Sequence, residues 1–277
     1  MGLRINTNVA SLAAQRSLGN TTNTFNDSLR KLSSGERVTR SGDDAAGLAI
    51  SENLKAQIRG LKQAGRNAGD AISLIQTAEG GLSEISNIII RLRELSVQAA
   101  SDTVGQTERG FSDIEFQQLK EELDRIARSS EFNGIKLLDG TSGLLEFQVG
   151  VRNDPVLDRL RYDGTFTDAT MATLGLSAET VSSKEAAQIS LKKLDDALVQ
   201  VNGVRANLGA IQNRLTSTVN TLGISDENLN AANSRIRDVD VAAETAELAR
   251  KNILIQAGTS VLSQANQFPS IALKLIG

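Results

Sequence analysis

The sequence predicts a mainly α-helical protein in which long helices pack as a coiled coil, with a small β-hairpin region in the middle. Three observations support this class. Two long blocks without proline flank residues 140–180, and proline breaks helix interiors. Both blocks repeat apolar residues at alternating steps of three and four, as one face of a helix does. Between them, Asn-Gly, Asp-Gly and Ser-Gly turn signals separate short apolar runs.

The first block predicts one helix from about residue 44 to 99. Asp43 and Asp44 suit its N-terminus by capping and by the helix dipole, and Ser101 to Gly105 end it. Its length of roughly 80 Å requires partner helices of similar length, because such a helix cannot bury its face alone. The apolar and small residues of its seam are Leu54, Ile58, Leu61, Gly65, Ala68, Ile72, Ile75, Ala78, Leu82, Ile85, Ile89, Leu92 and Leu95.

A second helix is expected at about 107–129. Its charged run from Lys120 to Arg125 is interpreted as a solvated face. The side chains expected to point inward are Phe111, Ile114, Leu119, Leu123 and Ile126.

Residues 131–180 change in character. Alternating apolar residues on both sides of Asn153-Asp154-Pro155 predict a β-hairpin with strands near 144–151 and 156–163.

The second helical block starts at about Ser183. Gly223 and the pair Ser225-Asp226 predict a break, followed by a further helix from about 226 to Gln267. The apolar seam before the break is Leu191, Leu194, Leu198, Val201, Val204, Leu208, Ile211, Leu215, Val219 and Leu222.

Both chain ends are amphipathic and poor in charge. Arg4 and Arg16 are the only charged side chains in residues 1–24, and Lys274 is the only one in residues 252–277. Chain ends normally carry solubilising charge, so these ends are expected to be buried against other copies. Packing of the ends on their own domain is the alternative. A membrane-surface helix is disfavoured because basic residues are sparse.

The composition excludes most catalytic and binding chemistry. The chain has no His, Cys or Trp, a net charge of −3, and 3% aromatic residues. Disulfides, cysteine zinc sites and Ser-His-Asp triads are therefore excluded, and there is no basic field or stacking platform for nucleic acid. An all-carboxylate Mg²⁺ or Ca²⁺ site stays formally open. We therefore expect no enzyme, no cofactor, and no catalytic, cofactor-binding or metal residues.

No apolar run is long enough for a transmembrane helix, and the N-terminal stretch does not fit a secretory signal peptide. Taken alone, these features indicate a cytosolic protein without membrane insertion.

Five segments together resemble bacterial flagellin, the subunit of the flagellar filament. They are INTNVASLAAQRSL, LRKLSSGERVTRSGDDAAGLAISENL, IRLRELSVQAA, EFNGIKLLDG and AGTSVLSQANQFPSIALKLI, in that order. The resemblance implies an antiparallel helical coiled-coil bundle formed by both chain ends. Residues 1–40 with 226–277 would be the inner-tube helix pair, and 41–143 with 183–225 the helical-bundle domain. Residues 144–182 would be the hairpin and a short variable segment, so the chain looks like a near-minimal, core-only flagellin.

The resemblance also implies function and partners. The chain would polymerise into the flagellar filament used for swimming motility, after unfolded export through the flagellar type III channel. Its location would then be extracellular, with a sheathed or periplasmic filament left open. Implied partners are the export apparatus, a flagellin chaperone, and filament cap and hook-junction proteins. The alternative function is a flagellar hook–filament junction protein. The expected polymerisation contacts are Leu3, Ile5, Val9, Leu12, Leu18, Val261, Leu262, Phe268, Leu273 and Leu275.

One segment resembles the flagellin region that the animal receptor Toll-like receptor 5 binds. Arg91, Leu95 and Glu115 match positions tied to that contact, whereas Ile90 departs from the Gln that many receptor-active flagellins carry. The residues themselves indicate subunit packing on an amphipathic helix. The resemblance further implies that the hairpin takes part in switching between supercoil forms.

Overall fold

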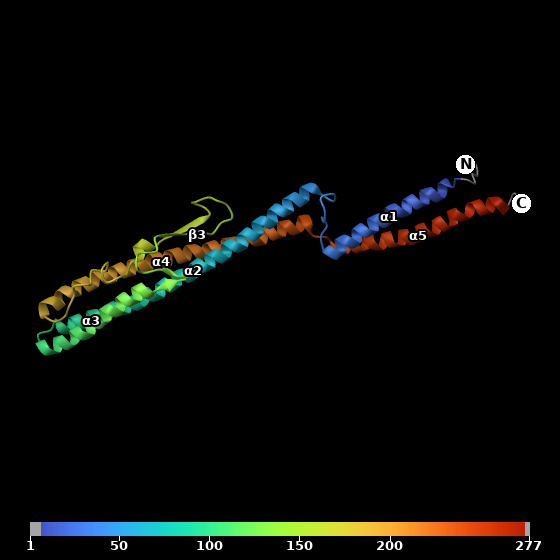
Figure 1. Cartoon of the computed structure of the whole chain (residues 1–277). Coiled ribbons are helices and arrows are strands. Elements are labelled where there is room, and N and C mark those ends of the chain that lie inside the picture. Colours follow the sequence, from blue (N-terminus) through green and yellow to red (C-terminus); the bar gives the residue numbers. More distant parts are fainter. Residues whose placement is uncertain (1–6, 275–277) are drawn as a thin grey trace. The chain divides into compact units, whose positions relative to one another are not determined.

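The structure, a computed structural model, describes residues 7–274, and the side chains of residues 7–267. The mainly α-helical class with a central hairpin is confirmed (Figure 1). The described helices are α1 (Val9–Ser34), α2 (Ala45–Ala99), α3 (Gln106–Ser129), α4 (Lys184–Arg237) and α5 (Val241–Lys274).

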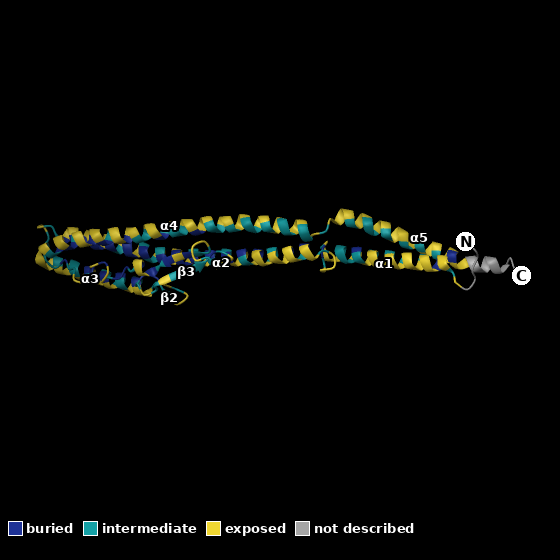
Figure 2. Ribbon diagram, turned by 90° about the horizontal axis from the view of Figure 1, so that it is seen from above, coloured by how far each residue is buried: buried dark blue, intermediate teal, exposed yellow. Residues whose placement is uncertain are grey.

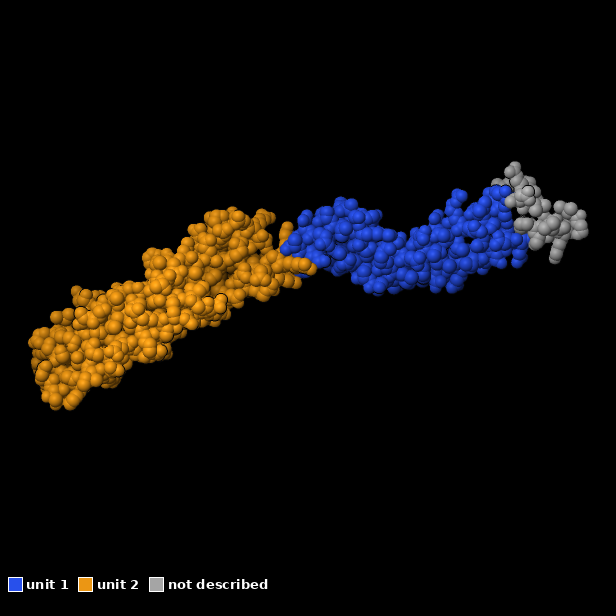
Figure 3. Space-filling model, viewed as in Figure 1, with its two compact units in different colours: residues 1–56, 228–277 blue, residues 57–227 orange. Residues whose placement is uncertain are grey.

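The chain divides into two compact units (Figure 3). Unit 1 combines residues 1–56 with 228–277, and unit 2 is residues 57–227. Residues 41–56 thus group with the chain ends, whereas the resemblance assigned them to the bundle. The three-part division concerns roles in an assembled filament and stays a prediction.

Unit 2 is organised around the seam of α2, which lies along α4 and α3. The predicted apolar series on α2 is buried at Ile58, at Leu61 and from Ala68 onwards, whereas Leu54, Gly65 and Ile72 are partly buried. The antiparallel pairing of α2 with α4 is also marked by an Arg93–Asp195 ion pair at 2.7 Å. Figure 2 shows the buried residues concentrated in unit 2. The largest fully buried side chains include Ile75, Leu82, Ile85, Ile89 and Leu92 of α2, Phe116 and Leu123 of α3, and Leu194 of α4.

Two inward assignments on α3 are wrong. Phe111 and Ile114 are 68% and 64% exposed, and the helix instead buries Phe116, Lys120, Leu123 and Ala127. These four are spaced four, three and four, so they form one face. The sequence offered a second apolar arc on the same helix, and periodicity alone could not choose between the two. Leu119 and Ile126 are partly buried against the core, and the interpretation of Lys120 as solvated is also wrong.

The predicted break at residues 223–226 is wrong as well. Helix α4 continues to Arg237, and α5 begins at Val241. A helix-interior glycine costs only about 1 kcal/mol, so Gly223 does not by itself end a helix. The actual restart is set by Asp240, whose Oδ1 accepts hydrogen bonds from the backbone N–H of Ala242 and of Ala243 at 2.9 and 3.1 Å.

The middle of the chain holds two small antiparallel pairs. The predicted hairpin is present as β3 (Leu144–Gln148) and β4 (Arg159–Asp163), in which Glu146 is opposite Arg161. A shorter pair that the sequence analysis did not predict consists of β1 (Glu131–Phe132) and β2 (Ile135–Lys136). Its Asn-Gly turn has φ of 50° and 79°, the left-handed geometry that tight hairpin turns need.

Candidate assembly surfaces

Polar and small side chains hold the two terminal helices together. Asn8 caps α1 by accepting from the Ser11 N–H at 3.1 Å, and its Nδ2 donates to the Ala265 carbonyl at 2.8 Å. Ser11 Oγ bonds Asn266 at 2.7 Å, and the Lys251 ammonium donates to Ser28 Oγ at 2.7 Å. Most residues of α1 and most of the described side chains of α5 nevertheless remain exposed.

Several of the expected polymerisation contacts lie on that uncovered surface. Val9, Leu12 and Val261 are 65%, 53% and 56% exposed. Leu18 and Leu262 are partly buried, and a Cβ built on Gly258 would lie 3.2 Å from Leu18 Cδ1. Leu3, Ile5 and Leu275 lie outside the described residues, as do the side chains of Phe268 and Leu273, whose backbone belongs to α5.

The exposed apolar surface of unit 1 is larger than the expected contacts suggest. Burying one such side chain between copies would contribute about 1.5–3 kcal/mol. The 3- and 4-residue spacing on these ends indicated an amphipathic helix but not which residues the partner helix leaves free. The further exposed residues are Leu29, Ile50, Val241, Ile253 and Leu254.

A polar joint connects the helices within unit 1. Arg237, at the end of α4, pairs with Glu36 at 2.8 Å and Glu52 at 2.5 Å. The backbone N–H of Arg37 donates to the Arg237 carbonyl at 2.6 Å, and Val239 N–H donates to the Gly35 carbonyl at 3.0 Å. The α4–α5 junction is thus bound to the loop between α1 and α2.

Of the three residues matched to the receptor contact, Arg91 and Glu115 lie together on the surface and Leu95 does not. Arg91 of α2 pairs with Glu115 of α3 at 2.8 Å and with Glu94 at 2.9 Å, and both Arg91 and Glu115 are about half exposed. Hydrogen bonds from the Arg91 guanidinium to Glu94 and Glu115 raise its pKa above the ordinary value. Leu95, by contrast, is 2% exposed and belongs to the core.

The exposed apolar residues beside this ion pair complete a surface that we name the acidic–apolar face. The pair Arg91–Glu115 joins α2 to α3, and exposed residues within two turns of it on either helix flank the pair. The face consists of Ile90, Arg91, Glu94, Val97, Phe111, Ile114 and Glu115, and its four apolar members are 44–68% exposed.

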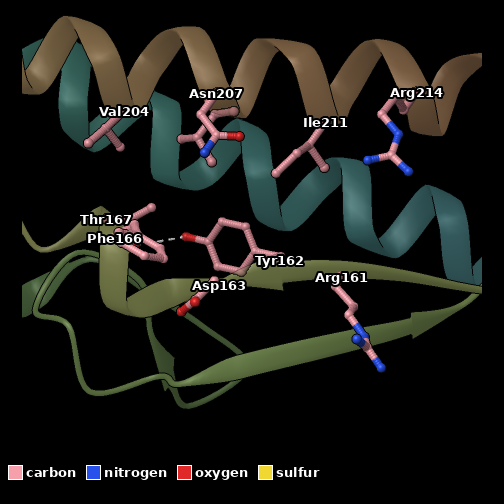
Figure 4. A pocket seen from close by; sticks show the side chains of 10 residues that line it. Arg161, Tyr162, Asp163, Phe166, Thr167, Val204, Asn207, Ile211 and Arg214 are labelled. Atoms are coloured by element: carbon pink, nitrogen blue, oxygen red, sulfur yellow. Dashed lines mark hydrogen bonds between the residues drawn. The ribbon is translucent and has the colours of Figure 1, made fainter. Parts of the chain in front are cut away.

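A groove runs between the hairpin and α4 (Figure 4). It contains a cavity of about 280 Å³ and a second of about 240 Å³, and Arg214 lines both. We name it the hairpin groove. Its first cavity is lined by Arg161, Tyr162, Phe166, Asn207, Ile211 and Arg214, among others. Its second is lined by Val156, Leu157, Arg159, Arg214, Ser217 and Thr218, among others.

The floor of the groove is fixed by Tyr162. Its hydroxyl donates to Thr167 Oγ1 at 3.1 Å (Figure 4). Thr167 Oγ1 in turn donates to the Leu137 carbonyl at 2.7 Å. Burial raises the pKa of Tyr162 above the ordinary value. The rim, in contrast, is exposed and apolar: Val156, Leu157 and Phe166 are 82%, 79% and 71% exposed.

A polar stripe on α3 holds the segment that leads into α4. The buried Lys120 ammonium donates to the carbonyls of Ser177 and Glu179 at 3.1 and 2.7 Å and to Gln117 Oε1 at 3.1 Å. Burial lowers its pKa below the ordinary value. The Asp113 carboxylate accepts from the Val181 N–H at 2.8 Å. The spacing of Asp113, Gln117 and Lys120 could have suggested this face, but a run of charges is usually solvated.

Within residues 7–274, no cluster of three or more acidic side chains is placed to hold a metal ion. The same part of the chain has no helix that is long and apolar enough to cross a membrane.

Comparison with known proteins identifies the family. Residues 5–143 match the sequence model of the bacterial flagellin N-terminal helical region, and residues 191–276 match that of the C-terminal helical region. The chain belongs to the bacterial flagellin family. It is 46% identical to a flagellin of Halalkalibacterium halodurans over 98% of this chain and 99% of that protein. It is 42% identical to the flagellar filament 33 kDa core protein of Treponema phagedenis, over 98% and 99% of the two chains.

Solved structures agree with this assignment. The crystal structure of Bacillus cereus flagellin matches with a TM-score of 0.51 and 33% identity, over 57% of this flagellin and 88% of that chain.

Proposed function

We propose that this flagellin is a structural subunit that polymerises into the bacterial flagellar filament used for swimming. The observation that carries the proposal is the terminal helix pair, whose polar internal contacts leave apolar residues of both helices exposed. A surface of this kind is typical of an interface between copies. The names of the relatives, flagellin and flagellar filament core protein, support the same role.

In the filament, residues 1–40 and 226–277 form the inner tube, and the residues of 41–143 and 183–225 form the surrounding bundle. The contacts between copies are heterologous and do not close, so they generate a helical polymer. The apolar contacts within the inner tube are made by Leu3, Ile5, Val9, Leu12, Leu18, Val261, Leu262, Phe268, Leu273 and Leu275.

Seeded polymerisation of the purified full chain, viewed by negative-stain microscopy, tests this role. We expect uniform filaments from the unaltered protein, and soluble monomer after removal of about 20 residues from either end. A double variant, Leu12→Ser with Val261→Ser, removes exposed apolar surface without touching the described core. It should raise the minimal protein concentration for assembly, because each lost contact is worth about 1.5–3 kcal/mol. Unchanged assembly of these variants would refute the inner-tube role.

The family role further places the protein outside the cell in a flagellum, after export without a cleaved presequence. The export apparatus, a chaperone, the filament cap and the hook-junction proteins are its partners in this proposal. A hook–filament junction protein is the rival role, and copy number separates the two: thousands of subunits for a filament against about one ring. A catalytic role is not proposed, since the family is structural.

Recognition by Toll-like receptor 5 is a second, narrower proposal. The exposed Arg91 and Glu115 support it, whereas the buried Leu95 can act only by shaping the helix beneath them. A reporter-cell assay with monomer tests it, and Arg91→Ala should reduce the response. No response to the unaltered monomer would reject the proposal.

A further inference from the structure

Two Asn-Gly pairs occur in the sequence, and the structure places them in opposite backbone settings. Asn133-Gly134 forms the turn between β1 and β2, whereas Asn202-Gly203 lies inside helix α4. In such a pair the backbone nitrogen of the glycine can attack the side-chain amide of the asparagine. Glycine favours this reaction because it has no side chain to hinder the approach and its backbone rotates freely.

The two pairs offer the same access to solvent. All four residues are exposed, and neither asparagine side chain is hydrogen-bonded to any residue that the structure describes. A Cβ built on Gly134 or on Gly203 would meet nothing within 4 Å. Crowding by neighbouring side chains therefore does not distinguish the pairs, and the backbone decides which of them can react.

The backbone of α4 protects the second pair. Asn202 lies in the interior of a helix that runs from Lys184 to Arg237. Each N–H in a helix interior donates to the carbonyl four residues earlier, so the nitrogen of Gly203 is engaged. Val201, the residue before the pair, is 1% exposed and belongs to the core. A reaction at Asn202 therefore requires the middle of a packed helix to open, which is among the costliest local openings in a protein.

The turn between β1 and β2 gives its pair much less protection. Only two residue pairs close it, between residues 131–132 and 135–136. The Gly134 nitrogen donates no hydrogen bond to any residue of the described chain. Attack on the side chain requires rotation about the Asn133 Cα–C bond, out of the left-handed turn. A hairpin of this length is marginally stable, so transient opening of its tip supplies that rotation.

We propose that Asn133 is a site of spontaneous deamidation in the folded chain. The Gly134 nitrogen forms a bond to Cγ of Asn133 and gives up its proton. The bond from Cγ to the side-chain nitrogen breaks, and that nitrogen leaves as ammonia. Water then adds to one of the two carbonyls of the five-membered imide. One ring opening gives aspartate, and the other gives isoaspartate, in which the main chain runs through the former side chain.

The product changes the turn while the base of the hairpin stays anchored. Isoaspartate adds one methylene group to the main chain and one negative charge, so the two-residue turn loses its geometry. Leu137 and Leu138, which follow β2, are both fully buried. The Leu137 N–H donates to the Ser130 carbonyl at 3.1 Å, and the Ala169 N–H donates to the Leu138 carbonyl at 2.9 Å. The change is therefore confined to residues 131–136, and the core beneath them is kept.

The two Asp-Gly turns of this region are poorer sites for the same ring closure. An ionised carboxylate resists attack by a nitrogen nucleophile far more than a neutral amide does. Oδ1 of Asp139 also accepts from the Thr141 N–H and hydroxyl at 3.0 and 2.6 Å. Oδ1 of Asp163 accepts from the Thr165 N–H and hydroxyl at 3.0 and 2.7 Å. These bonds hold both carboxylates in place, whereas the Asn133 amide is not held.

Peptide mapping by mass spectrometry tests the proposal on the full-length monomer. The protein is incubated in warm, mildly alkaline buffer, digested, and searched for the mass shift of an amide-to-carboxyl change. We expect the shift at Asn133, with isoaspartate present beside aspartate, and at least about tenfold less at Asn202. In concentrated urea, where the helix no longer protects its pair, the two asparagines should react to similar extents.

A matched variant and hydrogen exchange complete the test. Asn133→Gly keeps a dipeptide that suits the tight turn but removes the amide, so residues 131–136 should show no mass shift. In the deamidated wild-type chain, the Ile135 amide should exchange faster, whereas the Leu138 amide should stay protected.

The outcomes are distinct from those for the filament role, because the experiment uses monomer and involves no contact between copies. Equal modification of Asn133 and Asn202 in the folded chain, or no modification at Asn133, would overturn the proposal. Aspartate without isoaspartate would indicate direct hydrolysis of the amide and would overturn attack by the Gly134 nitrogen. None of these results bears on whether the chain forms filaments.

Discussion

Replacing the buried lysine of α3 tests whether it holds the return of the chain into α4. Lys120 is 3% exposed, and all three protons of its ammonium are used, on Gln117 and on the carbonyls of Ser177 and Glu179. Methionine keeps the apolar stem and the approximate volume but removes the donor. The variant Lys120→Met therefore isolates the hydrogen bonds from the packing.

The size of the loss follows from what each acceptor retains. A hydrogen bond to a charged group contributes about 1.5–3 kcal/mol, and a buried acceptor without a donor costs about 1–3 kcal/mol. The Glu179 carbonyl keeps a second bond from Gln117 Nε2 at 3.2 Å, and Ser177 is exposed, so water can replace the ammonium there. Removal of the charge also ends its desolvation penalty. We therefore expect Lys120→Met to lower the free energy of unfolding by about 2 kcal/mol.

Urea unfolding of monomer, followed by circular dichroism, measures this change at constant m-value. Hydrogen exchange should locate it at the amides that close the turns before α4, such as Leu176 and Glu179. Lys193→Met is the control, since Lys193 is exposed on α4 and its loss should change stability by less than about 0.5 kcal/mol. If both variants unfold alike, or if exchange at residues 176–179 stays unchanged, Lys120 does not anchor this segment.

Two further predictions follow from the same structure. A Cβ on Gly81 would lie 2.7 Å from Leu138 Cδ1, whereas a Cβ on neighbouring Gly80 would meet nothing within 4 Å. Thermal unfolding should therefore show that Gly80→Ala stabilises by about 1 kcal/mol and that Gly81→Ala destabilises by about 1–2 kcal/mol; the same sign for both would contradict the close packing of Leu138. A hydrogen bond from the Thr39 hydroxyl, with others from nearby backbone and Arg40, lowers the pKa of Asp43 from 3.8 to about 2. Between about pH 4 and pH 2 the unfolded chain therefore binds more protons than the folded chain. The stability that Asp43 contributes is present above about pH 4 and is lost as the pH falls towards 2. The Asp43→Asn variant should remove this pH dependence, which amide exchange at Thr39 measures.

The sequence was most informative where a helix has a single apolar stripe with one helical period over many residues. On α2, from Ile75 to Leu95, every member of the predicted series is buried, because a long helix with a single apolar stripe has only one way to face its partners. The hairpin of β3 and β4 was equally predictable, since a single Pro-containing turn separates two runs of alternating apolar and polar residues.

Periodicity was less informative where a helix has apolar residues on two faces. On α3, Phe111 and Ile114 are three residues apart and Phe116 and Leu123 are seven apart. Both spacings fit a helical period, so only the tertiary contacts decide which pair is inside. The buried face even includes a lysine, because carbonyls from a distant segment satisfy its ammonium. Neither the presence of that segment nor its position can be read from the helix itself.

The wrong inward assignment on α3 has a physical reason that bears on assembly. Phe111 and Ile114 look like core residues by composition, yet the chain buries a different face and leaves these two in solvent. A residue selected for burial by its chemistry but exposed in the single chain is the expected signature of a contact between copies. The same reasoning applies to Val9, Leu12 and Val261 on the terminal helices. In a protein whose proposed role is assembly, positions where sequence periodicity predicts burial and the single chain shows exposure are therefore the first to examine for subunit contacts.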